Sequence, residues 1–300
     1  ERNASDSTSK KLLRDKGCFA ELCNYAFFQG RQVIQPEELV SRENDLSTLI
    51  GKVDRPTEIK RYRDVVRKAS IHGEYVIIGV EHQSTFDEKM IFRILNYDAT
   101  TYINQVESKK EVYPVGSFVF YTGDEEWKLL ETLKETLKSI PSEMEPNIND
   151  WRLPVVDLKT MDARKLMNRR LRDVVEISQS MFAGSYDGLR ENRKIETESF
   201  MMATTFTCTK IKREDLPEGD EINMCKAMDQ LFQRFENQGI EKGEAIGIEK
   251  TLKEQLKVKL GTISSPLEEK LTTTSLEKLN ELTLNIFNIN SEEDVLKIIH

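Results

Sequence analysis

The sequence predicts an α/β protein in which a sheet flanked by helices is followed by a helical carboxy-terminal region. Short apolar runs rich in β-branched residues alternate with longer segments whose apolar residues recur at helical spacing. From Met161 onward the chain is more polar and keeps the helical spacing. Because 300 residues exceed a typical single domain, we expect one sizeable core and a smaller appendage.

The expected organisation has four regions. Residues 1–9 are small, polar or charged, which is typical of a disordered start. Residues 10–160 hold the alternating strands and helices of the core, and residues 161–236 are predicted to form a helical extension. Residues 237–300 are predicted to form a glycine-striped helix and a small helical domain.

Within the core, a first helix is predicted from Lys10 to Phe28. An alternating segment at 61–68 and an apolar run at 75–80 are joined by His72-Gly73, which predicts a hairpin whose second strand is central. A helix is predicted from about Ser84, with Ser84 or Thr85 as its cap residue, to about Val106. Two further extended segments complete the core, at 113–121 and 147–158.

The central strand ends on polar residues. Glu81 and Gln83 leave the same face of the strand, because side chains alternate. A carboxylate at the end of a hydrophobic sheet is costly unless another group pairs with it. If the two strands pair as a hairpin, Asp64 approaches Glu81, and a hard cation such as Mg²⁺ relieves the repulsion between two close carboxylates. Asp45, in the preceding polar loop, is the alternative first carboxylate, although its neighbours lack a strand pattern.

An Asp on one strand and Glu-x-Gln on the next resemble the active site of the PD-(D/E)XK nucleases, with Gln83 where the lysine usually stands. A wider set of segments extends the likeness: Arg63-Asp64-Val65, Glu81-His82-Gln83-Ser84, Met90, Phe92-Arg93, Tyr97-Asp98-Ala99, Gln105, Pro114 to Trp127, Phe19-Ala20-Glu21-Leu22, Met224-Cys225-Lys226-Ala227, and Gln238 to Gly243. With these segments, nearly the whole chain resembles the Rpn family of recombination-promoting nucleases and transposase-like proteins. The joint pattern is specific, although each element alone is weak.

The resemblance implies a mixed, restriction-endonuclease-like sheet and Mg²⁺-dependent hydrolysis of DNA phosphodiester bonds, with Mn²⁺ as a substitute, in recombination, mobile-element or defence roles. Asp64 and Glu81 would bind the metal, with the backbone carbonyl of His82 as a further ligand. A metal-bound water would attack the phosphorus. Gln83 can orient this water but carries no positive charge. The alternative is a catalytically weak or inactive nuclease-fold protein that binds DNA or a partner.

Four further residues are candidates for supporting roles. Lys89, Arg93 and Tyr97 lie four residues apart, on one stripe of the helix after the site. Lys89 is either the cation that position 83 lacks or a surface residue. Arg93 is expected to contact a DNA phosphate or to brace Glu81, the alternative again being an ordinary surface residue. Glu21, in the first helix, either assists the metal, as the resemblance implies, or is a solvated helix acid.

Because the net charge of the chain is negative, any binding of DNA depends on local clusters of basic residues. A net charge of −8, from 44 basic and 52 acidic residues, argues against nonspecific coating of DNA. Basic residues around Asp64 flank the proposed metal site and are expected to contact phosphates. They are Lys60, Arg61, Arg63, Arg67 and Lys68. A second basic cluster, at 164–172, is expected to be a solvated face that balances acidic neighbours.

Several classes of protein are disfavoured. The four cysteines, at positions 18, 23, 208 and 225, are too few and too scattered for a disulfide framework, and with three histidines they lack zinc-site spacing. No apolar run approaches membrane-spanning length, and the amino terminus lacks the pattern of an export signal. We therefore expect a cytoplasmic protein that does not act with a membrane.

The carboxy-terminal region suggests self-association. Gly239, Gly243 and Gly247 repeat every four residues along one stripe of a predicted long helix, which permits close approach of another helix, although a flexible connector is the alternative. The apolar residues after Ser264 recur at helical intervals but are too few for a large core. We expect a two-fold homodimer through this region, the alternative being that the last helices fold back onto the nuclease core.

Overall fold

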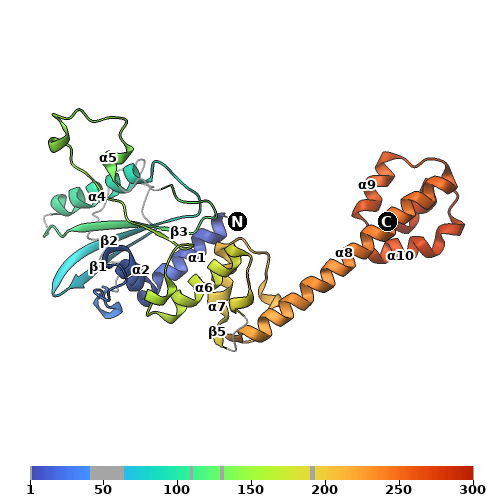
Figure 1. Cartoon of the computed structure of the whole chain (residues 1–300), viewed down its shortest axis with the longest axis horizontal. Coiled ribbons are helices and arrows are strands. Elements are labelled where there is room, and N and C mark those ends of the chain that lie inside the picture. The colour runs from blue at the N-terminus through green and yellow to red at the C-terminus, as the bar shows by residue number, and fades with distance from the viewer. Residues whose placement is uncertain (1, 41–63, 109–110, 129–131, 190–192, 300) are drawn as a thin grey trace. The chain divides into compact units, whose positions relative to one another are not determined.

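The computed structural model describes residues 2–40, 64–108, 111–128, 132–189 and 193–299. Its centre is a four-stranded sheet in the order β1-β2-β3-β4 (Figure 1). The strands are β1 (Val65–Ile71), β2 (Glu74–Gln83), β3 (Val115–Tyr121) and β4 (Val155–Asp157). β1 runs antiparallel to β2, whereas β2, β3 and β4 run parallel. The predicted mixed sheet flanked by helices is therefore confirmed.

β1 and β2 form the predicted hairpin. The register pairs Ile71 with Glu74, so the loop consists of His72 and Gly73. Both loop residues have positive φ angles, 52° and 87°, which match the right-handed twist of paired strands. Glycine adopts this backbone conformation without steric cost, so Gly73 permits the tight turn that sets β2 beside β1.

Helices cover both faces of the sheet (Figure 1). α4 (Met90–Glu107) packs on one face, against Val119 and Tyr121. The other face carries the larger core, in which Val80, Phe118 and Phe120 meet apolar side chains of several helices. These helices are α1 (Arg2–Arg14), α2 (Lys16–Phe28), α6 (Arg169–Ala183) and α7 (Thr197–Phe206).

The amino-terminal residues are helical, so the prediction of a disordered start is wrong for residues 2–9. Leu12 and Leu13 are fully buried and anchor α1 in the core, while the small side chains of Ser5 and Ser9 also fit into buried positions. The predicted single helix from Lys10 to Phe28 is divided at Asp15. The Asp15 carboxylate caps the start of α2 by accepting a hydrogen bond from the Cys18 amide at 2.8 Å.

α4 begins at Met90 rather than at Ser84. The Asp87 carboxylate accepts a hydrogen bond from the Lys89 amide at 2.9 Å, and the Asp87 carbonyl accepts one from the Met90 amide at 3.1 Å. Such local bonds from an aspartate side chain compete with helix formation. Phe86 also packs edge-on against Trp127, with ring centroids 5.1 Å apart. The predicted helix start is therefore too early.

The chain forms two compact units, Glu1–Lys226 and Ala227–His300. α6 and α7 belong to the first unit, because Leu171 and Met202 join the core of the sheet. α6 and α7, from the region expected to be a helical extension, thus pack on the sheet, whereas the residues of that region from Ala227 onward belong to the second unit. Between α6 and α8, β5 (Lys194–Glu196) and β6 (Glu221–Asn223) form a separate antiparallel pair.

The second unit has an apolar core of its own, formed by its own helices. Among the residues that the structure describes, nine buried ones form this core, including Leu252, Leu256 and Leu282. They come from α8 (Met224–Leu260), α9 (Ser265–Thr273), α10 (Leu276–Asn285), α11 (Glu292–Ile299) and the turn between α10 and α11. The remaining short elements are α5 (Leu133–Thr136) and single turns at Pro36–Glu38, Glu145–Asn147, Ala163–Lys165, Asp187–Leu189, Arg213–Asp215 and Ile286–Asn288. Within the described ranges, no helix is both long and apolar enough to cross a membrane.

Candidate functional site

Three consecutive polar residues end β2 inside the protein. The solvent-exposed fractions of Glu81, His82 and Gln83 are 4%, 3% and 8%. The register pairs Glu81 with Val119 and Gln83 with Tyr121, and these two β3 side chains pack beneath α4. Glu81 and Gln83 therefore share the α4 face, as the alternation of side chains predicts, while His82 faces the opposite layer.

An arginine from α4 holds the Glu81 carboxylate. Arg93 Nη2 donates to Glu81 Oε1 at 2.6 Å, and Arg93 Nη1 donates to Asp87 Oδ2 at 3.0 Å. The side-chain nitrogen of Gln83 lies 3.4 Å from the same Glu81 oxygen. The side chains of Glu81 and Arg93 are 5% and 34% exposed, so the pair lies at the border of the core. Of the two contacts predicted for Arg93, the one to Glu81 is present.

The Arg93 guanidinium is held in its charged form. Burial opposes the charge, but hydrogen bonds to Tyr97 and Asp87 and the nearby Glu81 carboxylate outweigh it and raise the pKa of Arg93 above its ordinary value. Tyr97 lies one turn further along α4 and is nearly buried. Lys89, the other candidate cation, stands at the start of α4 with an exposed side chain. The positive charge beside Glu81 thus comes from Arg93.

Asp64 is anchored to the backbone of β2. Its Oδ2 accepts a hydrogen bond from the His82 amide at 2.9 Å, and Lys10 Nζ of α1 lies 3.4 Å from its Oδ1. Extending the register of Val65 with Val80 by one residue sets Asp64 opposite Glu81. Asp64 therefore lies at the same strand ends as Glu81. That the two carboxylates share a cation stays a prediction.

The His82 ring lies in the opposite layer, where it meets two residues to which the sequence assigned no role, Thr122 and Asp6. Its Nε2 lies 2.8 Å from Thr122 Oγ1, and its Nδ1 lies 3.3 Å from Asp6 Oδ1. Burial lowers the pKa of His82, against the opposing effect of the Asp64 and Asp6 carboxylates. Sequence reasoning assigned a role only to the His82 carbonyl and missed Asp6, because residues 1–9 were expected to be disordered.

Comparison with known families adds an independent observation. Residues 58–207, which are half of the chain and include Asp64, Glu81 and Arg93, match the family described as "Putative transposase, YhgA-like". The chain belongs to this family. The match agrees with the resemblance to the Rpn nucleases and transposase-like proteins. Neither a search of curated proteins nor a search of solved structures found a match.

Glu21 lies outside the span that matches the family, and its carboxylate is buried rather than solvated. Glu21 Oε1 accepts hydrogen bonds from Gln32 Nε2 at 3.0 Å and from the Met167 amide at 2.9 Å. Its Oε2 accepts one from the Asn168 amide at 3.1 Å. The expectation of a solvated helix acid is therefore wrong, and the carboxylate ties α2 to the loop before α6.

The basic residues of β1 contact groups within the protein. Arg67 Nη2 donates to the carbonyl of Arg14, the last residue of α1, at 2.7 Å. Lys68 Nζ lies 3.8 Å from the ring centroids of both Tyr75 and Tyr113. Phosphate binding by Arg67 and Lys68 stays a prediction. Four residues named from the sequence lie outside the described residues: Asp45, Lys60, Arg61 and Arg63.

The second basic cluster is balanced by carboxylates, as expected. Arg170 Nε donates to Glu196 Oε2 at 2.7 Å, and Arg164 Nε lies 2.8 Å from Asp162 Oδ1. Arg164 is 89% exposed, which is typical of a solvated surface pair. This cluster provides no argument for a DNA surface.

A metal would depend on few side chains. In the part of the chain that the structure describes, no group of three or more His, Cys, Asp or Glu side chains is arranged to hold a metal ion. Mg²⁺ is usually bound through one or two carboxylates together with waters and substrate phosphates, so two carboxylates at one place are sufficient in kind. Asp64 and Glu81 offer hard oxygen donors at neighbouring strand ends, and that they bind a metal stays a prediction. Burial raises the pKa of the Cys18 and Cys23 thiols.

Proposed function

We propose that this chain is a metal-dependent DNA endonuclease of the PD-(D/E)XK type. The observation that carries the proposal is the pair of carboxylates at the ends of β1 and β2, where Asp64 is bound to the His82 amide and Glu81 is buried against Arg93. A buried carboxylate beside a second one at a strand end is costly for folding, and proteins keep such arrangements chiefly for function. Membership of a transposase family supports a role in acting on DNA.

The residues present fit Mg²⁺, with Mn²⁺ as a substitute. Asp64 and Glu81 would hold the ion through carboxylate oxygens, with the carbonyl of His82 as a further hard ligand. When bound, the ion would lower the pKa of a water and stabilise charge on the phosphate. Around it, the Gln83 amide would orient a water, which an amide can do as donor or acceptor.

Arg93 would supply the positive charge that a lysine at position 83 would carry. Its guanidinium lies at the Glu81 carboxylate and is kept charged by its neighbours. A fixed cation near the scissile phosphate stabilises charge that develops there during the reaction. Because a guanidinium presents five N–H groups, Arg93 can keep its contact with Asp87 while it donates toward a phosphate.

The test is cleavage of supercoiled plasmid by the full chain in Mg²⁺, in Mn²⁺ and in EDTA. Asp64→Asn and Glu81→Gln should each abolish cleavage while the far-UV circular dichroism of the protein is retained. Asp220→Asn is the matched control, because Asp220 is an exposed carboxylate remote in sequence from both strands. The proposal fails if the unaltered protein leaves the plasmid intact in both metals, or if Glu81→Gln cleaves as fast as the control.

One observation favours a second candidate, a nuclease-fold protein that binds DNA or a partner without cutting. Position 83 is a glutamine, and Glu81 Oε1 is already bound by Arg93 at 2.6 Å, a contact with which a metal must compete. In an electrophoretic mobility assay in Mg²⁺, this candidate shifts labelled DNA without producing fragments. If its ligand is a protein partner instead, the partner is bound and the DNA is neither shifted nor cut. The endonuclease proposal requires fragments.

We also propose that the protein acts in the cytoplasm as a homodimer joined through its carboxy-terminal region. Cys18 and Cys23 are buried free thiols, which are usual in a reducing compartment. In α8, Gly239, Gly243 and Gly247 have open space where a side chain would begin, within the described residues. Ile240 and Ile246 of the same helix are 54% and 64% exposed. Two copies of α8 could pack along this surface, and a dimer would place one site at each DNA strand.

A further inference from the structure

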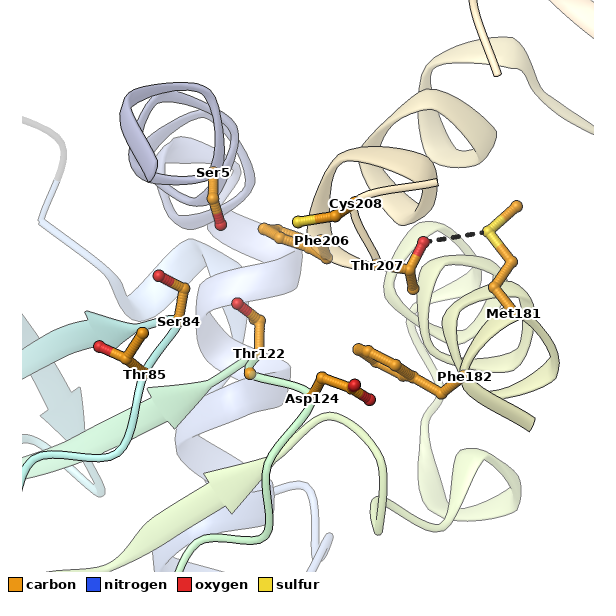
Figure 2. Close-up of a pocket in the computed structure, with 11 residues that line it drawn as sticks. Ser5, Ser84, Thr85, Thr122, Asp124, Met181, Phe182, Phe206, Thr207 and Cys208 are labelled. Carbon is orange, nitrogen blue, oxygen red and sulfur yellow. Dashed lines mark hydrogen bonds between the residues drawn. The ribbon is translucent and has the colours of Figure 1, made fainter. Parts of the chain in front are cut away.

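A cavity lies at the ends of β2 and β3, on the side of the sheet opposite to α4. It encloses about 450 Å³, which is within the range of about 300–1,000 Å³ typical of sites for small molecules. Figure 2 shows its walls, formed by α1, by the loops that follow β2 and β3, and by the carboxy-terminal ends of α6 and α7. All of these elements belong to the unit Glu1–Lys226.

The cavity adjoins the proposed phosphodiester site. Ser84 and Thr85, which line it, directly follow Gln83. The Thr122 amide donates to the Gln83 carbonyl at 2.9 Å, so the ends of the two strands are tied together. Gly123 permits this approach, because a Cβ atom there would lie 2.7 Å from the Ser84 carbonyl oxygen. A ligand in the cavity is therefore held by the same strand ends that carry Asp64 and Glu81.

Ser5 of α1 presents a buried hydroxyl to this cavity. The residue is 4% exposed, and its Oγ has no hydrogen-bond partner among the described residues. Figure 2 shows this hydroxyl turned toward the space above Ser84 and Thr122. Buried polar groups in native proteins are nearly always hydrogen-bonded, and exceptions call for an explanation. A ligand that hydrogen-bonds to Ser5 provides one.

The other polar groups of the cavity favour a ligand with N–H donors. Asp124 lines the cavity, and an ionised carboxylate only accepts hydrogen bonds. Thr122 Oγ1 is bound to His82 Nε2, and Asp6 faces the opposite ring nitrogen. A hydroxyl has one hydrogen and two lone pairs, so Thr122 can bind His82 Nε2 in either tautomer of the ring and keep a lone pair. Because Thr122 lines the cavity, this lone pair is available to accept a hydrogen bond from a ligand.

The apolar walls favour a flat and uncharged ligand. Phe182 is half-buried, and its ring points into the cavity in Figure 2. Phe206 is held edge-on against Phe120, with ring centroids 6.0 Å apart. Among the described residues that line the cavity, Asp124 carries the one formal charge, and it is negative. Lys159 Nζ, which is outside the lining, donates to the Asp124 carbonyl and lies 5.7 Å from the centroid of the Phe182 ring. The lining itself offers a phosphate no cation, whereas a planar ring with amino groups would stack on the aromatic side chains.

We propose that this cavity binds one unstacked nucleobase that carries an exocyclic amino group, such as adenine or cytosine, while the DNA backbone lies at Asp64 and Glu81. The placement of the backbone rests on the proposed nuclease function. Stacking on Phe182 supplies affinity for any base, and the acceptors Asp124 and Thr122 select against thymine, whose carbonyl groups would face them. The enzyme thereby prefers sites at which such a base can leave the stack.

The experiment is titration of the full chain, without metal, with deoxyadenosine, deoxycytidine and thymidine, followed by ligand-observed NMR. Deoxyadenosine and deoxycytidine should bind at least about fivefold more tightly than thymidine. Phe182→Ala should weaken binding by at least about fivefold, the lower range for base stacking. Phe287→Ala is the matched control, because Phe287 is 89% exposed and lies in the other unit.

Two further variants test the polar wall. Asp124→Asn should reduce the preference for deoxycytidine over thymidine, because an amide both donates and accepts. Ser5→Ala should weaken nucleoside binding and leave the unfolding temperature of the free protein unchanged or higher, because it removes an unsatisfied hydroxyl. A merely structural serine would instead lower the unfolding temperature and leave the affinity unchanged.

The proposal is overturned if no nucleoside binds, if all three bind equally, or if Phe182→Ala and Ser5→Ala leave affinity unchanged. Its failure is distinguishable from failure of the proposed function. Glu81→Gln should abolish cleavage and keep nucleoside binding. Selective nucleoside binding by a protein that does not cleave DNA would support the base site and reject the nuclease, whereas Glu81-dependent cleavage without nucleoside binding would reject only the base site.

Discussion

Replacing Arg93 by methionine should destabilise the protein chiefly through the loss of its contact with Glu81. The two groups meet at 2.6 Å, and the Glu81 side chain is 5% exposed. Removing one partner of a buried ion pair typically costs about 3–5 kcal/mol, because a charge is left without compensation. Arg93 itself is 34% exposed, so water can partly replace it. We therefore expect a loss of about 2 kcal/mol in the free energy of unfolding.

A double-mutant cycle isolates this contact. Glu81→Gln alone should change the free energy of unfolding by less than about 1 kcal/mol, because it removes a buried charge together with the pair. In the Glu81→Gln background, Arg93→Met should cost about 1–2 kcal/mol less than in the original chain. Urea unfolding followed by circular dichroism measures all four proteins. Arg164→Met is the matched control, because Arg164 forms an exposed pair and should have little effect.

The result that refutes this reasoning is additivity. If Arg93→Met costs the same free energy with and without the Glu81 carboxylate, the guanidinium does not stabilise Glu81, and its effect comes from Asp87 or from packing. Plasmid cleavage by Arg93→Met should also fall strongly, because the charge beside the proposed metal ligand is removed. Full cleavage by Arg93→Met would remove Arg93 from the proposed chemistry while leaving the stability argument intact.

Three further predictions follow from other contacts. Arg67→Met should lower the free energy of unfolding by about 1–3 kcal/mol, because Arg67 donates to the carbonyl of Arg14 at the end of α1. The salt dependence of DNA binding should stay unchanged. A smaller slope of affinity against salt concentration would instead assign Arg67 to phosphate binding. Burial lowers the pKa of His82 in the folded state, so the unfolded state binds a proton first as the pH falls. The contribution of His82 to the free energy of unfolding should therefore be fully present above about pH 6.5 and be lost below it, as measured by urea unfolding in EDTA. His82→Gln should flatten this pH dependence. The neighbours Asp6, Asp64 and Lys10 remain in both proteins, so an unchanged pH profile in the variant would show that they, rather than His82, set it. Light scattering should give a dimer for the full chain and a monomer for Gly243→Glu, since Gly243 has open space around it within its own chain; a monomer in both cases would reject the homodimer.

The sequence alone determined which residues end the central strand and on which face they lie. The alternation of side chains along residues 75–83 is local, so it predicts that Glu81 and Gln83 share a face whatever the strand packs against. The hairpin through His72 and Gly73 was readable for the same reason, since the turn and both strands are adjacent in the chain. The helical spacing after these strands likewise placed Arg93 on the stripe that reaches Glu81.

Tertiary structure decided the partners that come from distant segments. Nothing in the composition of residues 2–9 indicates that α1 packs on the sheet and brings Asp6 to His82, because this depends on Leu12 and Leu13 filling the core. The burial of Glu21 against the loop before α6 and the contact of Arg67 with α1 have the same origin. Local patterns fix what a segment presents on each face, whereas the groups that meet that face are selected by non-local packing of the whole chain.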